Sequence, residues 1–511
     1  MKLNDSKSDV CFVIPSIAKK AYQKLSDTYS AIEPPTWALL LAQSLRAKNL
    51  NSSILDFDAD PHTLDESLKS IIETKARLVV FVLYGQNPNS GTTLMIGASE
   101  LASHLKKNHP DIKIAFIGSH VSALPLEVIK LDYVDFAFIN EGVFALLALL
   151  ETNLKDHLDK IPGIWFKDKD GTPKKGALGI IVKTDQMDTI IPGYAWDLLP
   201  KDKLVLDKYR AHFWHTNFLH KNRTPFAAIY TSLGCQFGCN FCMINIVNRT
   251  SHEERISAAD SKGMRFWSPS LILKEFEKLW EFGVRTLRIS DEMFFLNKKY
   301  YIPILEGLIE RGLKFNLWAY ARVDTVRKDQ LELFKKAGVN WLALGIESGN
   351  QNIRVEIDKG RFKQVNIREV VKNIKSAGIN VLGNYIFGLP DDNISTMTET
   401  LNLAIELQCE HSNFYSAQAL PGSPLYLFAK DQKWDIPKKY EEFAFLSYEC
   451  KPLRTKHLTA KEVLDFRDNA WHKYFSNQSY LNLVENKFGK KSKKNLMELA
   501  KINLKRKILE H

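Results

Sequence analysis

The sequence has little cysteine, no long apolar run and little net charge outside its C-terminal end. Six of its 511 residues are cysteine, too few for a secreted scaffold held by disulfides. No run of about 18 apolar residues occurs, so no membrane span is expected. Residues 1–9 are polar and lack the apolar core of a signal peptide, which favours a cytoplasmic location.

The formal net charge of +11 is concentrated at one end of the chain. From Lys487 onward there are nine Lys or Arg and two Asp or Glu, which gives +7 and leaves +4 for all the residues before it. A basic segment of this kind is usually a solvated helical face, so nucleic acid is not an expected partner.

The first part of the chain, residues 1–151, alternates short apolar runs with amphipathic stretches. This alternation predicts an α/β fold with a doubly wound parallel sheet. Its strands are expected at Val10–Ile14, Ser53–Phe57, Leu78–Leu83, Ile112–Ile117 and Val134–Ile139. Its helices are expected at Thr36–Ala47, Leu64–Glu73, Leu94–Lys106 and Val143–Glu151. The length of the chain leaves room for one or two further domains.

Three further regions follow. Residues 152–222 are irregular and rich in turn residues, and we interpret them as a linker with a small β element. Residues 223–425 alternate again, which predicts either a partial barrel or a second open sheet, with strands at Phe226–Thr231, Arg285–Ser290, Lys314–Ala319, Trp341–Gly345, Val381–Phe387 and Asn413–Gln418. Residues 426–511 have a mainly helical pattern and end in the basic tail.

Three of the six cysteines, Cys235, Cys239 and Cys242, fall within eight residues directly after a predicted strand. Thiolates are the usual ligands of iron–sulfur clusters, and three of them leave one iron of a cubane open to a small molecule. Zinc is the alternative metal, but structural zinc needs four protein ligands and no second pair of ligands follows. The spacing therefore predicts a [4Fe–4S] cluster.

This CxxxCxxC pattern resembles the signature of the radical S-adenosylmethionine superfamily. Further segments resemble the family's strand ends, in order: Arg288-Ile-Ser-Asp-Glu-Met-Phe294, Tyr320-Ala-Arg-Val-Asp324, Gly345-Ile-Glu-Ser-Gly349, Phe387-Gly-Leu-Pro390 and Pro421-Gly-Ser-Pro424. The resemblance implies a partial (β/α)6 barrel over residues 223–425, with its site at the carboxyl ends of the strands. It also implies that S-adenosylmethionine is bound by Phe241, Glu292, Arg322, Glu347, Ser348 and Gly388.

The order of a doubly wound domain and then a radical barrel resembles the cobalamin-binding members of that superfamily. The matching segments are Glu33-Pro-Pro-Thr-Trp37, Ile117-Gly-Ser-His-Val-Ser-Ala-Leu-Pro125, Asn140-Glu-Gly142 and Met264-Arg-Phe-Trp-Ser-Pro269. The resemblance implies cobalamin contacts from Tyr84, Gly85, Gln86, Gly118, Ser119, His120, Glu141 and Gly142. The Asp-x-His-x-x-Gly signature of cobalamin proteins with a histidine ligand is absent, and Asp60-Pro-His62 is interpreted as a chance match.

The resemblance implies a radical enzyme in which a 5′-deoxyadenosyl radical abstracts hydrogen from a small-molecule substrate. Cobalamin-dependent methyl transfer to an unactivated carbon is the expected reaction, and an electron donor such as flavodoxin or ferredoxin is the expected protein partner. Oxidative cyclisation or another radical rearrangement is the alternative within enzymes, and a cobalamin-binding sensor without turnover is the alternative of another class. A tRNA methylthiotransferase is excluded, because it needs three N-terminal cysteines and only Cys11 precedes the barrel.

Overall fold

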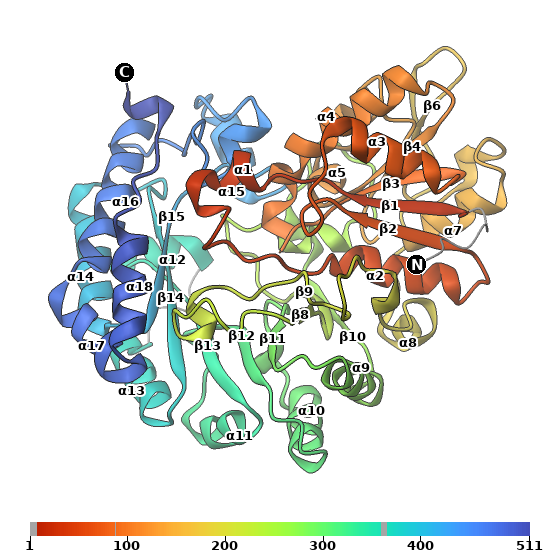
Figure 1. Cartoon of the computed structure of the whole chain (residues 1–511). Helices are drawn as coiled ribbons and strands as arrows, with labels where there is room; N and C mark the ends of the chain where they lie inside the picture. The colour runs from red at the N-terminus through yellow and green to blue at the C-terminus, as the bar shows by residue number, and fades with distance from the viewer. Residues whose placement is uncertain (1–7, 87, 359–364, 511) are drawn as a thin grey trace.

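The computed structural model describes residues 8–86, 88–358 and 365–510. Figure 1 shows two sheets in separate parts of the molecule, one formed by the N-terminal residues and one by the middle of the chain. The C-terminal helices stack beside the last strands of the second sheet. An α/β architecture with a helical C-terminal region is thereby confirmed.

The first sheet contains the five predicted parallel strands in the order β2-β1-β3-β4-β5. They are β1 (Val10–Ile14), β2 (Ser52–Asp56), β3 (Leu78–Leu83), β4 (Lys113–Gly118) and β5 (Phe136–Phe138). Two more strands from the expected linker, β6 (Ile164–Lys167) and β7 (Pro173–Lys175), add to its edge in antiparallel orientation. The small β element thus continues the N-terminal sheet.

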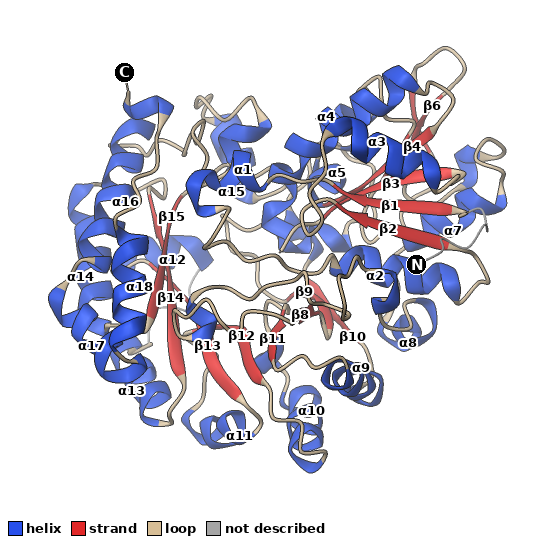
Figure 2. Cartoon of the chain, in the orientation of Figure 1, coloured by secondary structure: helices blue, strands red, loops and turns tan. Residues whose placement is uncertain are grey.

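Alternate residues of these strands face opposite layers of helices. In β1, Phe12 packs in one apolar cluster and Val13 in the other, because successive side chains of a strand point to opposite faces. One layer contains α2 (Thr36–Arg46) and α7 (Val143–Glu151), and the other contains α3 (Leu64–Glu73) and α4 (Gly91–Asn108), with the short helices α1 (Ala18–Tyr22), α5 (Ser119–Ala123) and α6 (Pro125–Ile129). Figure 2 shows helices on both sides of this sheet, as a doubly wound fold requires.

The second sheet has six parallel strands in sequential order, which is the partial (β/α)6 barrel. Its strands are β8 (Phe226–Ile229), β11 (Thr286–Ile289), β12 (Asn316–Arg322), β13 (Val339–Glu347), β14 (Asn380–Phe387) and β15 (His411–Ser416). The outer helices are α9 (Pro269–Glu281), α10 (Lys298–Glu310), α11 (Leu331–Lys336), α13 (Ile367–Ser376) and α14 (Ile394–Leu407). The short helix α12 (Gln351–Asp358) packs against the cysteine loop instead. The third strand lies later than predicted and extends through Arg322.

A two-stranded ribbon that the sequence did not predict precedes the first barrel helix. It pairs β9 (Ser232–Cys235) with β10 (Gly263–Phe266) in antiparallel orientation, and the cysteine segment lies between them. The first cysteine therefore ends a strand, and only the other two lie in the loop that follows.

The helices of the C-terminal region are α15 (Pro424–Asp431), α16 (Ala460–Phe475), α17 (Gln478–Phe488) and α18 (Lys490–Ala500). The linker contains one short α-helix, α8 (Met187–Ile190). Tyr474 on α16 and Tyr480 on α17 donate hydrogen bonds to the carbonyls of Cys409 and Glu410, at 2.7 and 3.1 Å. These helices therefore close the open side of the barrel beside β15. No helix among the described residues is both long and apolar enough to cross a bilayer.

A buried ion pair joins the two sheets' domains. Arg265 on β10 forms two hydrogen bonds to Glu141, which follows β5, at 2.7 and 3.0 Å. The same guanidinium donates to the carbonyl of Val182 and to Asn248. Because both charges are buried, this contact fixes how the N-terminal sheet sits against the cysteine ribbon.

Candidate active site

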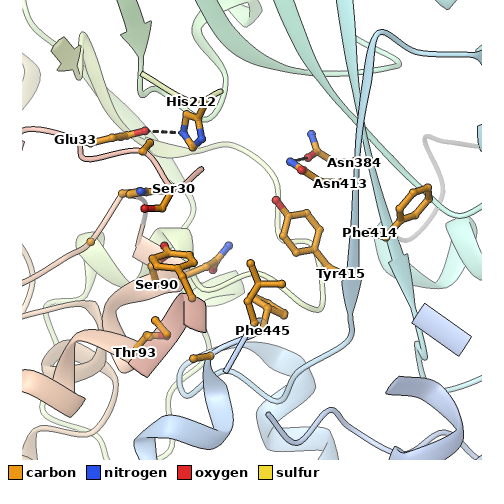
Figure 3. Close-up of a pocket in the computed structure, with 18 of the residues that line it drawn as sticks. Ser30, Glu33, Ser90, Thr93, His212, Asn384, Asn413, Phe414, Tyr415 and Phe445 are labelled. Carbon is orange, nitrogen blue, oxygen red and sulfur yellow. Dashed lines mark hydrogen bonds and ion pairs between the residues drawn. The ribbon is translucent and has the colours of Figure 1, made fainter. Parts of the chain in front are cut away.

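One cavity of about 820 Å³ lies where the carboxyl ends of the two sheets face each other. Its wall contains residues that follow β3, residues at the carboxyl ends of the barrel strands, and residues of the linker and the C-terminal helices. Both fold types place ligands at this end of their strands. Figure 3 shows part of the wall, with Ser90 and Thr93 on the N-terminal side and Asn384, Asn413 and Tyr415 on the barrel side.

The three clustered cysteines all line this cavity and are half-buried. Buried Asn245 organises their loop, since it accepts a hydrogen bond from the Cys235 amide at 2.7 Å and donates one to the Phe237 carbonyl at 2.9 Å. The Met243 amide, next to Cys242, donates to Asn89 Oδ1 from the N-terminal domain at 3.1 Å. The first domain therefore helps to position the thiol loop.

The donor set of the loop fits an iron–sulfur cluster. Burial, followed by the neighbouring thiol of Cys239, raises the pKa of the Cys242 thiol well above its ordinary value, so the thiols lie close enough to repel one another once ionised. A cubane bonds each of three thiolates to a different iron and leaves the fourth iron open, whereas structural zinc needs four protein ligands, so three thiols suit a cluster better than zinc.

Glu292, directly after β11, presents an unsatisfied carboxylate to the cavity. Its Oε1 atom is buried and has no hydrogen-bond partner among the described residues. Burial raises its pKa to about 7, an effect that Arg288 partly opposes. The adjacent Asp291 is engaged elsewhere, with bonds of 2.5 to 2.6 Å from Thr231 and Ser232. Glu292 therefore fits an incoming ammonium group, such as the one that S-adenosylmethionine carries.

Arg322 and Glu347 lie at the ends of the next two strands and also line the cavity. Arg322 forms a bidentate ion pair with Asp324, at 2.9 and 2.7 Å, and lies 3.7 Å from the ring centroid of Phe237. Glu347 has a left-handed backbone with φ of 64°, and burial raises its pKa to about 8. The two side chains bring an arginine and a carboxylate to the same rim as the thiols.

The remaining residues expected at the S-adenosylmethionine site divide into two groups. Phe241 lines the cavity. Ser348 and Gly388 do not: the Ser348 hydroxyl lies 3.1 Å from Thr400 Oγ1 and accepts the Asn350 amide at 3.1 Å. Gly388 has φ of 82°, and a side chain there would meet Val463 at 2.4 Å. These two residues shape the turns after their strands and do not face the cavity.

Of the eight residues expected to contact cobalamin, the three after β3 line the cavity: Tyr84, Gly85 and Gln86. The Tyr84 ring stacks on Trp37 with a centroid distance of 4.0 Å, and its hydroxyl donates to the Asn140 carbonyl. Gly85 has φ of 62°, a conformation that favours glycine. This loop therefore brings an aromatic ring, a glycine and polar side chains to the cavity at the edge of the first sheet.

The glycines and serine expected to contact cobalamin after β4 and β5 lie outside the cavity wall. A side chain at Gly118 would lie 2.3 Å from the Leu83 carbonyl oxygen, and one at Gly91 would lie 2.0 Å from Ser119 Oγ. Gly142 has φ of 65° at the start of α7. Close packing of strands against helices accounts for these small residues.

His120 and Glu141 are likewise buried in the N-terminal domain, away from the cavity. Burial lowers the pKa of His120 to about 4, so its imidazole is neutral, and its Nδ1 lies 3.0 Å from Thr92 Oγ1. Glu141 is taken up by Arg265 in the ion pair between the domains. The Asn-Glu-Gly motif therefore serves the domain interface.

Sequence reasoning missed a buried network in the cavity wall. Glu33 accepts from Arg288 on β11 at 2.6 Å and bonds to His212 of the linker at 2.9 Å. Figure 3 shows the Glu33–His212 contact above Ser30. Glu33 belongs to a segment that the sequence analysis did quote, but its partners lie 179 and 255 residues away, so no local signal could identify the network.

Comparisons with known proteins agree with this geometry. Residues 229–404 match the profile described as the radical SAM superfamily, a range that runs from the end of β8 through the cysteine loop and strands β11 to β14 into α14. Residues 23–150 match the profile described as a B12 binding domain, which covers most of the first sheet and the loop after β3. The predicted combination of domains is thereby confirmed.

Two curated relatives match most of the chain. An uncharacterized methyltransferase of Pyrococcus horikoshii is 25% identical over 445 residues, which cover 86% of this chain and 88% of the relative. An anaerobic magnesium-protoporphyrin IX monomethyl ester cyclase of Rubrivivax gelatinosus is 24% identical over 489 residues, which cover 92% and 79%.

A solved structure shares the fold across nearly the whole chain. It is the cobalamin-dependent S-adenosylmethionine radical enzyme OxsB with aqua-cobalamin and S-adenosylmethionine bound, at 15% identity and a TM-score of 0.66. The match covers 97% of this chain and 72% of that one. The arrangement of first sheet, half-barrel and C-terminal helices is therefore an established one.

Proposed function

The chain is a radical S-adenosylmethionine protein with a B12-binding domain, and we propose from this premise that it is a cobalamin-dependent methyltransferase. It would transfer a methyl group from S-adenosylmethionine to an unactivated carbon of a small molecule. The observation that carries the proposal is the cavity of about 820 Å³, whose wall contains both the three thiols and the loop after β3 of the B12-binding domain.

The residues present fit the groups that such an enzyme holds. Cys235, Cys239 and Cys242 would bind the cluster, and the unpaired carboxylate of Glu292 would take the ammonium of S-adenosylmethionine. Tyr84, Gly85 and Gln86 would face the corrin. When bound, the cluster with S-adenosylmethionine supplies a hydrogen-abstracting radical, and cobalamin supplies the methyl group. The protein positions the three groups and keeps water out of the space between them.

The overall reaction balances with an external reductant. A substrate C–H bond, two molecules of S-adenosylmethionine and two electrons give the methylated product, S-adenosylhomocysteine, 5′-deoxyadenosine and methionine. A flavodoxin or ferredoxin would supply the electrons. None of the six cysteines, all of which lie among the described residues, forms a disulfide, and we place such a partner in a reducing, cytoplasmic setting.

Oxidative cyclisation is the second candidate, because the cyclase of Rubrivivax gelatinosus matches 92% of the chain. A cyclase of this architecture would cleave S-adenosylmethionine to 5′-deoxyadenosine without transferring its methyl group. A sensor without turnover would need neither the complete thiol loop nor the unsatisfied Glu292 carboxylate beside it.

The products of S-adenosylmethionine separate these candidates. Anaerobically reconstituted protein, supplied with cobalamin and a chemical reductant, is expected to form both 5′-deoxyadenosine and S-adenosylhomocysteine. The Cys239→Ala variant should lose the 5′-deoxyadenosine. Formation of 5′-deoxyadenosine alone by the native protein would favour the cyclase, and formation of neither product would favour the sensor.

A further inference from the structure

The barrel strands line the inner end of the cavity with layers of side chains. On β12, Trp318, Tyr320 and Arg322 face the cavity, two residues apart, and on β15 His411, Asn413 and Tyr415 do the same. Arg322 belongs to the rim that also carries the thiols and Glu292. The other layers lie further from that rim, towards the amino ends of the strands. We call this end of the cavity the inner chamber, and none of the three groups discussed above is assigned to it.

Two asparagines of the middle layer hold each other in one orientation. Asn384 on β14 lies beside Asn413 on β15 in the sheet register. The Nδ2 of Asn384 donates to the Leu344 carbonyl at 3.3 Å, so its Oδ1 must face Asn413, whose Nδ2 donates to it at 3.1 Å. A backbone carbonyl can only accept, and this fixes both amides.

Asn413 is thereby left with an acceptor and a donor for a ligand. Its Oδ1 and its second N–H form no hydrogen bond with any described residue, and both belong to a half-buried side chain in the cavity wall. A carboxamide presents this acceptor and donor side by side. The complementary partner is a cis-amide or amino-imine edge, which can make two hydrogen bonds at once.

His212 adds a ring nitrogen on another side of the cavity (Figure 3). The Arg288 guanidinium keeps the pKa of Glu33 below its ordinary value, against the effect of burial, so Glu33 is ionised and can only accept. The Nε2 of His212, 2.9 Å from Glu33 Oε1, must therefore carry the proton. The Nδ1 atom is then the ring nitrogen that His212 offers to a ligand.

Aromatic rings form the floor below these polar groups. The His212 ring stacks on Trp214 with an interplanar angle of 20°, and Trp214 packs edge-on against Trp318 with a centroid distance of 5.2 Å. His411 also stacks on Trp214, with an interplanar angle of 18°, and burial lowers its pKa to about 3, so the His411 ring is neutral. These rings give the chamber an aromatic, largely apolar border.

The cavity wall offers no uncommitted cation for an anionic ligand. Each of its three arginines is paired with a carboxylate: Arg288 with Glu33, Arg322 with Asp324 and Arg467 with Asp468, at 2.6 to 2.7 Å. No lysine occurs among the described residues of the wall. A carboxylate or phosphate in the inner chamber would lose its hydration without gaining a counter-charge.

The geometry points to a neutral, planar heterocycle with a cis-amide or amino-imine edge as the substrate class, bound in the inner chamber by Asn413 and His212. This assignment rests on the proposed function and names the substrate class of its site. Asn413 offers this edge an acceptor and a donor, and the aromatic side chains of Trp214 and Trp318 border the chamber. The rest of the substrate extends towards the rim, where the radical forms.

Binding of small probes to reconstituted protein, measured by saturation-transfer NMR without S-adenosylmethionine, tests the assignment. 2-Pyridone carries the cis-amide edge, and N-methyl-2-pyridone has the same ring without the donor. We expect saturable binding of 2-pyridone, with N-methyl-2-pyridone weaker by about tenfold or more, the cost of losing one bidentate pair. Benzoate, which carries a charge, should bind more weakly than 2-pyridone.

Two matched variants locate the effect. Asn413→Leu should abolish the discrimination between 2-pyridone and its N-methyl analogue, while Asn503→Leu, on the C-terminal wall of the same cavity, should keep it. The assignment is overturned if 2-pyridone does not bind saturably, if both pyridones bind equally to the native protein, if benzoate binds better, or if Asn413→Leu still discriminates. The binding measurement involves no turnover, so its outcome does not depend on whether the protein transfers methyl groups.

Discussion

At the scale of single residues, the cavity is defined by polar groups that the protein does not satisfy itself. Asp291 and Glu292 are neighbours in the sequence, but Asp291 takes hydrogen bonds from Thr231 and Ser232 whereas Glu292 keeps a buried oxygen free. A buried carboxylate without a partner lowers stability, which a globular core would avoid. We therefore infer that a ligand at the rim donates the hydrogen bond that the Glu292 carboxylate lacks.

Replacing this carboxylate should weaken ligand binding without affecting the cluster. For Glu292→Gln we expect the affinity for S-adenosylmethionine to fall by about tenfold or more, because a charge-assisted hydrogen bond to the ammonium is lost. Isothermal titration would measure the affinity and iron analysis the cluster content. Glu277→Gln, which alters an exposed glutamate on α9, is the matched control and should change neither. Equal affinities in the two variants would exclude Glu292 from the site.

The raised pKa of Glu292 also predicts a pH dependence. Its pKa of about 7 means that the carboxyl becomes neutral as the pH falls through this value, so the charged form that attracts an ammonium is lost at lower pH. The affinity of the native protein should therefore fall as the pH is lowered from about 8 to about 6. Glu347, with a pKa of about 8, acts in the same direction. The affinity for S-adenosylmethionine should therefore be measured against pH for both the native protein and Glu292→Gln, and the two curves should differ in shape. Parallel curves would contradict the prediction.

The effect of removing a cluster cysteine can be compared with the effect of removing a cysteine elsewhere in the chain. Removal of any one of Cys235, Cys239 and Cys242 should prevent assembly of the cluster, since each thiolate holds a different iron. Cys11→Ala, which alters a buried thiol on β1, should retain about four irons per chain. Iron and sulfide analysis after anaerobic reconstitution measures this. A stoichiometric zinc site in the native protein would contradict it.

Functional residues that belong to a short local motif could be predicted from the sequence. Residues whose role depends on a contact with a distant part of the chain could not. The spacing of the three cysteines and the position of Glu292 after a strand are local features, and the cavity contains all four. The Glu33–His212–Arg288 network and the Asn384–Asn413 pair depend on how distant strands and the linker meet. Glu141 matched a motif correctly in sequence, but its partner is Arg265 and not a ligand in the cavity.

At the scale of elements, the β10 ribbon is the link between the two domains. Methionine in place of Arg265 would leave Glu141 as a buried charge without a partner. We expect Arg265→Met to lower the free energy of unfolding by about 3–5 kcal/mol, and the Glu141→Leu, Arg265→Met double variant to recover much of that loss. Urea unfolding followed by circular dichroism would compare the three proteins. A double variant as unstable as Arg265→Met would show that the ion pair is not the cause.

Strands and helices with a strong period were predicted closely, and elements fixed by tertiary contacts were not. β1, α3, β3 and α7 have the predicted bounds, because β1, β3 and α7 are apolar runs with clear ends and the apolar residues of α3 recur with the period of a helix. The β9–β10 ribbon contains Gly234, Cys235 and Gly263, residues with no strand preference, and its partner strands are separated by the cysteine loop. β7 contains Pro173 and two lysines, so only its place at the sheet edge makes it a strand.

At the scale of the whole molecule, function depends on two sheets meeting at their ligand-binding ends. Neither half contains the site alone: the B12-binding domain contributes the loop after β3 and Glu33, and the barrel contributes the thiols and Arg288. Sequence order predicted the two domains, because each has its own pattern of strands and helices. The cavity they share could not be predicted, since it depends on contacts such as Asn89 with Met243 that join distant parts of the chain.

If the shared cavity holds cobalamin beside the cluster, the purified protein should retain a corrin. Anaerobically reconstituted protein would be incubated with hydroxocobalamin, desalted, and examined by visible absorption together with iron analysis. The account predicts about one equivalent of corrin and about four irons per chain, with corrin also retained by the Cys239→Ala variant, whose B12-binding domain is unchanged. Protein that keeps its irons and releases all corrin on desalting would contradict the account.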